Sequence, residues 1–168
     1  MVLAALPCFV RRYYELVSAQ AALKKAWAEL LLKYDLDAVL LPPSGLPALP
    51  HGETADLTFC LTYMFLPNLL LWPAGTVPTT VVRPSAASYP GGPGGGGDGM
   101  GGGEPLPEAE RDSVARLAMK AMEGSAGLPV GVQVMAPMHR DEQCLRVMRL
   151  VEEGAGFAMA PPLAGLQL

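Results

Sequence analysis

The chain has 168 residues, which suits one domain or a part of a larger one, and 51% of them are hydrophobic while 17% are charged. Charged residues make up about a quarter of a typical soluble domain, so this chain either buries a large core or offers apolar surface to another molecule. Its net charge of −4 provides no basic surface for phosphates, which argues against nucleic acid as a partner.

The cysteines and histidines predict neither a disulfide framework nor a metal centre. Cys8, Cys60 and Cys144 are odd in number and widely spaced, which indicates free thiols in a reducing compartment. With His51 and His139 as the two imidazoles and no Cys-x-x-Cys pair, we expect no zinc site, and no motif predicts a cofactor. Residues 1–10 are apolar but precede a pair of arginines, the reverse of a secretory signal, so the sequence predicts an intracellular protein.

The first predicted element is an amphipathic helix over residues 11–34, a stretch without proline or glycine. Its predicted inner face consists of Tyr13, Leu16, Leu23, Trp27, Leu30 and Leu31. Residues 38–41 form a short apolar run that two prolines stop, which predicts a buried strand ending in a loop. A loop rich in proline and glycine follows over residues 44–52.

Residues 57–82 carry no charge and are long enough to span a bilayer. Three prolines and a glycine would break such a helix repeatedly, so a buried helix, turn and strand is favoured, with membrane contact as the alternative. We expect a helix over residues 57–66, capped by Thr54 or Asp56 and ending near Pro67. The glycine-proline block of residues 71–80 then predicts a turn that leads into a strand over residues 79–82.

The second half begins with an abrupt change in composition. Residues 85–107 are so rich in glycine and proline that we expect a disordered insertion. A helix is predicted over residues 108–123, and a second glycine-proline block at 127–134 leads into a strand over 130–135. Asp141 is expected to cap a last helix that runs through Glu153 with Leu145, Met148 and Val151 on its inner face.

The alternation of helices and strands predicts an α/β fold. Its few short strands indicate the edge of a larger sheet rather than a complete domain. The predicted division of the chain is a first part (1–84), the insertion (85–107), a last part (108–153) and a frayed tail (154–168).

Several motifs resemble, in the right order, the carboxy-terminal region of the amidase signature family. They are residues 34–43, residues 62–68 followed by Trp72-Pro73-Ala74-Gly75-x-Val77-Pro78, and residues 127–134 followed by 144–152. Within the family, the likeness is to the vertebrate enzymes that hydrolyse fatty acid amides. The resemblance implies the carboxy-terminal portion of the amidase signature fold, a mixed sheet covered by helices, which is incomplete in these residues.

The chemistry of that family needs residues that this sequence does not contain. The resemblance implies a serine nucleophile, a second serine in a cis peptide and a lysine base, all carried by the amino-terminal half of such enzymes. The glycine tract here contains no serine, and Lys24, Lys25, Lys33 and Lys120 occupy polar helix positions. We therefore predict no catalytic residue in this chain and no activity of the chain alone. Whether the chain is part of an active enzyme depends on the rest of the protein.

By the same resemblance, Thr58 and Leu61 are predicted substrate-binding residues, because they align with positions that line an acyl-chain channel. The alternative is that they are ordinary core residues of a helix. The implied partner is a fatty acyl amide, such as an N-acylethanolamine or a primary amide, hydrolysed to fatty acid and amine by the full-length form. The resemblance also implies that the full-length form can associate with the endoplasmic reticulum or another endomembrane through upstream segments, and can form a homodimer.

Two other hypotheses stay open at this stage. The first is a non-catalytic truncated product that binds lipid or a partner through its apolar face. The second is an independent serine hydrolase that uses Ser44 or Ser125 with His51 or His139, although neither serine stands in a nucleophile-elbow sequence.

Overall fold

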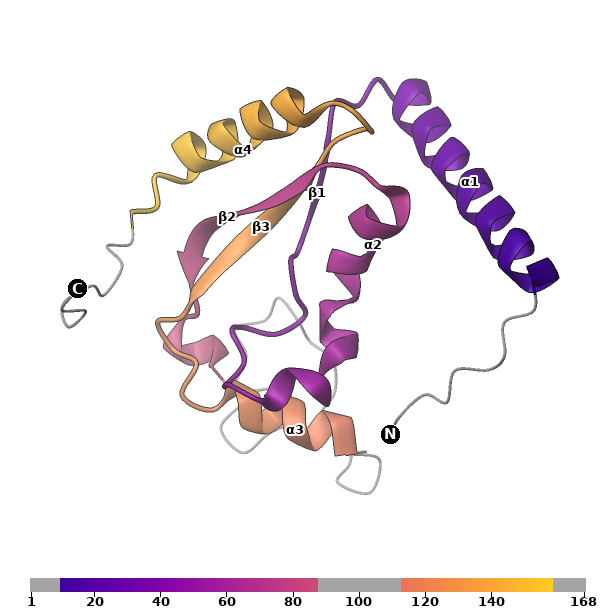
Figure 1. Ribbon diagram of the computed structural model, residues 1–168. Coiled ribbons are helices and arrows are strands. Elements are labelled where there is room, and N and C mark those ends of the chain that lie inside the picture. Colours follow the sequence, from indigo (N-terminus) through magenta and orange to yellow (C-terminus); the bar gives the residue numbers. More distant parts are fainter. Residues whose placement is uncertain (1–9, 88–112, 159–168) are drawn as a thin grey trace, which may run out of the picture.

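The computed structural model describes residues 10–87 and 113–158, in which helices and strands alternate as predicted (Figure 1). The α-helices are α1 (Val10–Lys33), α2 (Thr62–Leu70), α3 (Ser113–Met122) and α4 (Asp141–Ala155). The strands are β1 (Val39–Leu41), β2 (Ala74–Val81) and β3 (Pro129–Met135), and the short 3-10 helices are η1 (Glu53–Ala55), η2 (Thr58–Leu61) and η3 (Pro84–Ala86).

The three described strands form one sheet in the order β1-β3-β2, so the strand that comes last in the chain lies in the middle. Both pairings are antiparallel, with Val39 opposite Met135 and Ala74 opposite the same residue on the other side. The mixed α/β architecture is therefore confirmed. In the described part, the sheet is small and antiparallel rather than mixed.

Helices cover both faces of the sheet, as Figure 1 shows, with α4 on one side and α2 on the other, and α1 outside α2. The alternation of side chains along β3 decides which helix each residue meets. Met135 packs with Leu70 and Trp72 in the cluster that α1 and α2 complete. Val134 and Ala136 instead pack with Cys144 of α4.

Only the second half of α1 contributes to the core, which corrects the predicted inner face. Leu23, Trp27 and Leu31 pack into the cluster with Leu70 and Trp72, and the Trp27 and Trp72 rings meet edge to face at 6.2 Å. The other three predicted positions are exposed: Tyr13, Leu16 and Leu30. Tyr13 and Leu16 lie in the first half of α1, which extends beyond its shorter neighbour α2, since α1 has 24 residues and α2 has nine. Leu30 lies on the side of α1 away from the cluster, next to the buried Leu31.

The first glycine-proline block is not a turn before a strand but part of the strand itself. β2 begins at Ala74, five residues earlier than predicted, and contains both Gly75 and Pro78. Pro78 has no N–H to donate, and a strand accepts such a residue only at an edge or a bulge. β2 is an edge strand here, and its register with β3 shifts between Pro78 and Thr80.

The helix predicted over residues 57–66 is divided and longer. It starts as the 3-10 helix η2, continues as α2 from Thr62 and runs past Pro67 to Leu70. The predicted caps are wrong, because Leu57 and Leu61 precede the two segments and neither makes a side-chain capping hydrogen bond. The uncharged stretch nevertheless forms a helix, a turn and a strand as favoured, and among the described residues no helix has the length and apolarity needed to cross a bilayer.

The end of α2 places a leucine in a left-handed conformation. Leu71 has φ = 56°, while the Trp72 N–H donates to the Pro67 carbonyl at 3.0 Å and closes the helix end. This conformation costs a leucine about 1–2 kcal/mol and costs glycine almost nothing. Leu71→Gly is therefore expected to raise the free energy of unfolding by about 1 kcal/mol, measured by urea denaturation.

Leu69→Gly is the matched control, because Leu69 lies inside α2, where glycine costs about 1 kcal/mol relative to a good helix former. The two changes should shift stability in opposite directions. A loss of stability in Leu71→Gly comparable to that in Leu69→Gly would contradict the assignment of strain to residue 71.

The second half of the fold follows the predicted elements with two corrections in α4. Asp141 is the first residue of the helix rather than its cap, since Arg140 precedes it without a side-chain capping bond. Leu145 is 62% exposed, and the inner face consists of Cys144, Val147, Met148 and Val151. The predicted face was rotated, because Cys144 was not counted among the residues that face the sheet.

The remaining predictions concern the second half of the chain and the two termini, which the structure describes only in part. The strand over 130–135 is confirmed by β3, and α3 lies within the helix predicted over 108–123, with Ala118 and Ala121 buried. The predicted insertion begins in η3, and its remainder from residue 88 lies outside the described residues, as do residues 1–9 and most of the predicted tail. α4 continues to Ala155, two residues beyond its predicted end.

Candidate functional site

An apolar pocket of about 500 Å³ lies between the loop after β1, the middle of β2 and the start of β3. This volume falls within the range of about 300–1,000 Å³ typical of small-molecule sites. Its lining has no charged side chain and consists of Pro42, Pro43, Ser44, Gly45, Leu46, Pro47, Ala48, Leu49, Thr54, Leu61, Thr76, Pro78, Pro129, Val130 and Gly131. Such a lining suits a hydrocarbon.

The loop wall of the pocket is fixed by a single carbonyl of η2. The backbone N–H of Gly45 donates to the Cys60 carbonyl at 2.8 Å, and the Ser44 hydroxyl donates to the same oxygen at 3.4 Å. The N–H of Leu46 in turn donates to the Ser44 hydroxyl at 3.1 Å. Leu46 and Leu49 of this loop also pack against the buried cluster of Leu57, Ala118 and Ala121, which holds the loop against α3.

The sheet wall of the pocket is made by the two glycine-proline blocks, which lie opposite each other in the sheet. Pro78 of the first block pairs with Gly131 of the second, and Thr76 pairs with Gln133. A Cβ built on Gly131 would lie 2.8 Å from the Val77 carbonyl oxygen, so the close approach of the strands requires glycine there. The second block leads into β3 as predicted, whereas most of the first block belongs to β2 and contributes Thr76 and Pro78 to the pocket lining.

The two predicted substrate-binding residues occupy different places. Leu61 is half-buried at the end of η2 and lines the pocket. Thr58 is exposed and is not among the lining residues, because its hydroxyl turns back to donate to the carbonyls of Thr54 at 2.9 Å and Ala55 at 3.1 Å. Sequence reasoning did not find Thr76, Pro78 and the segment 129–131, although the glycine-proline blocks that contain them were the available signal.

The structure engages Ser44 in a local hydrogen-bond network and separates Ser125 from His139. The Ser44 hydroxyl is engaged within the pocket loop. Ser125 is buried, and its Oγ has no hydrogen-bond partner among the described residues. His139 lies beyond the other end of β3, a strand of seven residues that spans roughly 20 Å. This arrangement does not bring Ser125 and His139 together.

The two cysteines in the described part of the chain, Cys60 and Cys144, are not among the residues that line the pocket. Cys144 is free and buried on α4, on the face of the sheet away from the pocket, and its thiol donates to the Val134 carbonyl at 3.7 Å. Burial, followed by the nearby Asp141 carboxylate, raises the pKa of the Cys144 thiol above its usual value. Cys60 is free and half-buried. Within the described ranges, no group of three or more histidine, cysteine, aspartate or glutamate side chains could hold a metal ion.

A second recess of about 560 Å³ lies beside α4 and is polar. It contains Asp37, Glu142, Gln143 and Arg146 next to Val147 and Leu150. The Gln143 side chain donates to Asp37 Oδ1 at 2.7 Å and to the Asp37 carbonyl at 3.1 Å. These contacts tie α4 to the turn before β1, which is a structural role.

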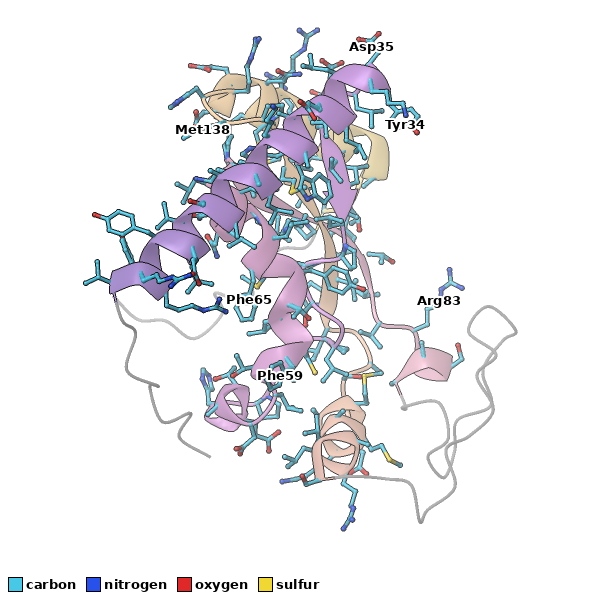
Figure 2. The ribbon with its side chains drawn as sticks, turned by 90° about the vertical axis from the view of Figure 1, so that its right-hand side faces the viewer. Tyr34, Asp35, Phe59, Phe65, Arg83 and Met138 are labelled. Atoms are coloured by element: carbon cyan, nitrogen blue, oxygen red, sulfur yellow. The ribbon has the colours of Figure 1, made fainter. Side chains whose placement is uncertain are left out.

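The outer side of η2 and α2 exposes large apolar side chains. Phe59 is 73% exposed and Phe65 is 45% exposed, and Figure 2 shows both on this part of the chain, with α1 in front. Tyr63, Met64 and Leu69 of α2 are exposed as well. Exposed large apolar side chains in this number favour a face that another part of a protein or a ligand covers.

Comparison with known proteins assigns both the sequence and the fold. A family model described as Amidase matches residues 9–145. Fatty acid amide hydrolase 1 of Caenorhabditis elegans is 33% identical over 150 residues, which cover 84% of this chain and 23% of that protein. Fatty-acid amide hydrolase 1 of Sus scrofa is 38% identical over 118 residues, covering 70% of this chain and 18% of that protein.

A solved structure of a fatty acid amide hydrolase matches the fold with a TM-score of 0.63 and 19% sequence identity, covering 89% of this chain and 24% of that one. The chain thus spans less than a quarter of the length of the curated relatives it matches. The region of this chain that the family model matches includes all the residues that line the apolar pocket.

Proposed function

The chain belongs to the amidase family, and we propose that it forms the acyl-chain side of an enzyme that hydrolyses fatty acid amides. One observation carries the proposal: Leu61, which the family resemblance assigns to an acyl-chain channel, lines an apolar pocket of about 500 Å³. Burying hydrocarbon in such a pocket is favourable by about 0.8 kcal/mol per methylene group. The substrate class named by the curated relatives, fatty acid amides, fits this lining.

The chemical step is proposed to depend on residues outside this chain. The 168 residues contain no Ser-Ser-Gly-Gly loop. The Ser44 hydroxyl is engaged in the pocket loop, and Ser125 is buried. The exposed apolar side of η2 and α2 is proposed to pack against the rest of an amidase fold, which would remove Phe59 and Phe65 from water. Membrane association, a homodimer and an endomembrane location of the whole protein stay predictions.

The test is a binding assay with oleamide, a long-chain primary amide, combined with a hydrolysis assay on the same preparation. The chain alone is expected to bind oleamide and not to hydrolyse it. Leu61→Asp and Val130→Asp place a charge in the apolar lining, where an unpaired charge is costly, and should weaken binding by about tenfold or more.

Leu145→Asp is the matched control, because Leu145 is 62% exposed on α4, on the other side of the sheet. It should leave oleamide binding unchanged. Equal binding by the two pocket variants and the wild type would contradict the pocket assignment.

The non-catalytic hypothesis and the serine-hydrolase hypothesis are separated by chemistry rather than by binding. Labelling of the purified chain by a fluorophosphonate, lost in Ser44→Ala or Ser125→Ala, would support an independent hydrolase and contradict the proposal. A chain that binds oleamide but never supports hydrolysis when combined with the remaining part of an amidase would support the lipid-binding alternative.

A further inference from the structure

Helix α2 contains a proline at a position where the helix should lose a hydrogen bond. Pro67 is the sixth of nine residues, and it is buried. In an α-helix the N–H of residue 67 would donate to the carbonyl of residue 63, but proline has no N–H. The Tyr63 carbonyl is therefore left without its normal partner, in a helix that nonetheless continues to Leu70.

The side chain of Gln133 takes the place of the missing N–H. Its Nε2 donates to the Tyr63 carbonyl at 3.2 Å, and the residue is only 4% exposed. Gln133 lies on the central strand, between Leu41 of β1 and Thr76 of β2. A buried amide in the middle of an apolar sheet is costly unless it is hydrogen-bonded, so its presence here is explained by the carbonyl that Pro67 leaves free.

This hydrogen bond joins the start of α2, next to the η2 side of the apolar pocket, to the sheet wall of the pocket. On one side, Tyr63 is two residues from Leu61, which lines the pocket. On the other side, Thr76 and Gly131 line the same pocket, and they are respectively the cross-strand partner and a near neighbour of Gln133 in the sheet. The bond thus fixes the start of α2 relative to the sheet beside the pocket.

We propose that Gln133 is a positioning residue that sets the separation of the two pocket walls, by replacing the helix hydrogen bond that Pro67 cannot make. The functional part of this proposal rests on the proposed function of the pocket. Without the bond, the first turn of α2 moves relative to β3, and the position of Leu61 relative to Thr76 in the pocket lining changes.

The test uses a cycle of variants in the full chain, with oleamide binding and the urea midpoint as readouts. Gln133→Met keeps the volume and removes the donor, and should weaken oleamide binding about tenfold and lower the midpoint. Pro67→Ala restores a backbone N–H to the Tyr63 carbonyl. In the Pro67→Ala background, Gln133→Met should therefore change binding less than threefold. If the single variant Gln133→Met does not fold, the double variant Pro67→Ala, Gln133→Met is still expected to fold. Its affinity for oleamide is then compared with that of Pro67→Ala, and a difference of more than threefold would contradict the proposal.

Val134→Ala separates positioning from general loss of stability. Val134 is fully buried on β3 next to Gln133, but it packs toward α4 on the other face of the sheet. It should lower the urea midpoint and leave the affinity of the folded protein for oleamide unchanged. If Gln133→Met behaves like Val134→Ala, the positioning role is wrong.

Failure of the proposed function and failure of the positioning role of Gln133 give different results. Wild-type protein that does not bind oleamide contradicts the proposed function and removes the pocket role of Gln133 with it. Wild-type protein that binds, together with an equal effect of Gln133→Met in both backgrounds, contradicts the replacement of the Pro67 hydrogen bond alone.

Discussion

Leu70→Ala is expected to lower the free energy of unfolding by about 3 kcal/mol, one of the two largest single-residue effects that we predict for this chain. Leu70 is fully buried at the end of α2, where it packs with Leu31, Trp72 and Met135. These residues come from α1, the turn before β2, and β3, so the change opens a cavity where three elements meet. Urea denaturation followed by circular dichroism measures the loss.

The neighbouring leucine provides the control. Leu69 stands in the same helix and is 46% exposed, so Leu69→Ala removes the same atoms with much less burial. It should cost less than about 1 kcal/mol. Similar losses at the two positions would mean that α2 does not pack on the sheet as described.

Gly131→Ala is expected to lower the free energy of unfolding by about 2–3 kcal/mol, because the added methyl group meets backbone as well as the short side chain of Thr76. A Cβ at this position would lie 2.8 Å from the Val77 carbonyl oxygen and 2.8 Å from Cγ2 of Thr76. The strands β2 and β3 would have to separate in the wall of the pocket, so oleamide binding should fall as well.

Gly75→Ala tests whether the clash at Gly131 is specific. Its Cβ would meet only Cε and Sδ of Met148, each at 2.6 Å, and these atoms form the flexible end of a methionine on α4. The cost should stay below about 1 kcal/mol, and binding should not change, because Met148 lies on the face away from the pocket. A larger loss at Gly75 than at Gly131 would contradict the described pairing of the strands.

The elements of the fold were predictable where the pattern of a local stretch was sufficient. β3 was predicted from a glycine-proline block followed by a β-branched run, and the structure confirms it. The start of β2 at Ala74 was not predictable, because Gly75 and Pro78 are local signals for a turn and become strand residues only when β3 pairs with them at a sheet edge. Pro67 misled the prediction of α2 in the same way, because Gln133, the residue that compensates for it, lies 66 positions away.

The candidate site was predictable only in part. The family resemblance selected Leu61, which lines the pocket, and Thr58, whose hydroxyl bonds to the backbone of its own turn. Whether either residue binds substrate stays a prediction. The opposite wall comes from residues 76–78 and 129–131, segments separated by about fifty residues and joined by the antiparallel register of β2 and β3.

The sequence by itself determined the α/β alternation, the family to which the chain belongs and the absence of the family's serine-rich nucleophile loop from these 168 residues. These follow from residue types and local spacing. The tertiary structure decided that the two glycine-proline blocks pair with each other and that α2 continues past Pro67. It also decided that an apolar pocket forms between the loop after β1 and the paired strands. The reason is that these features depend on hydrogen bonds and burial between distant segments. A local stretch of sequence contains only one of the two partners.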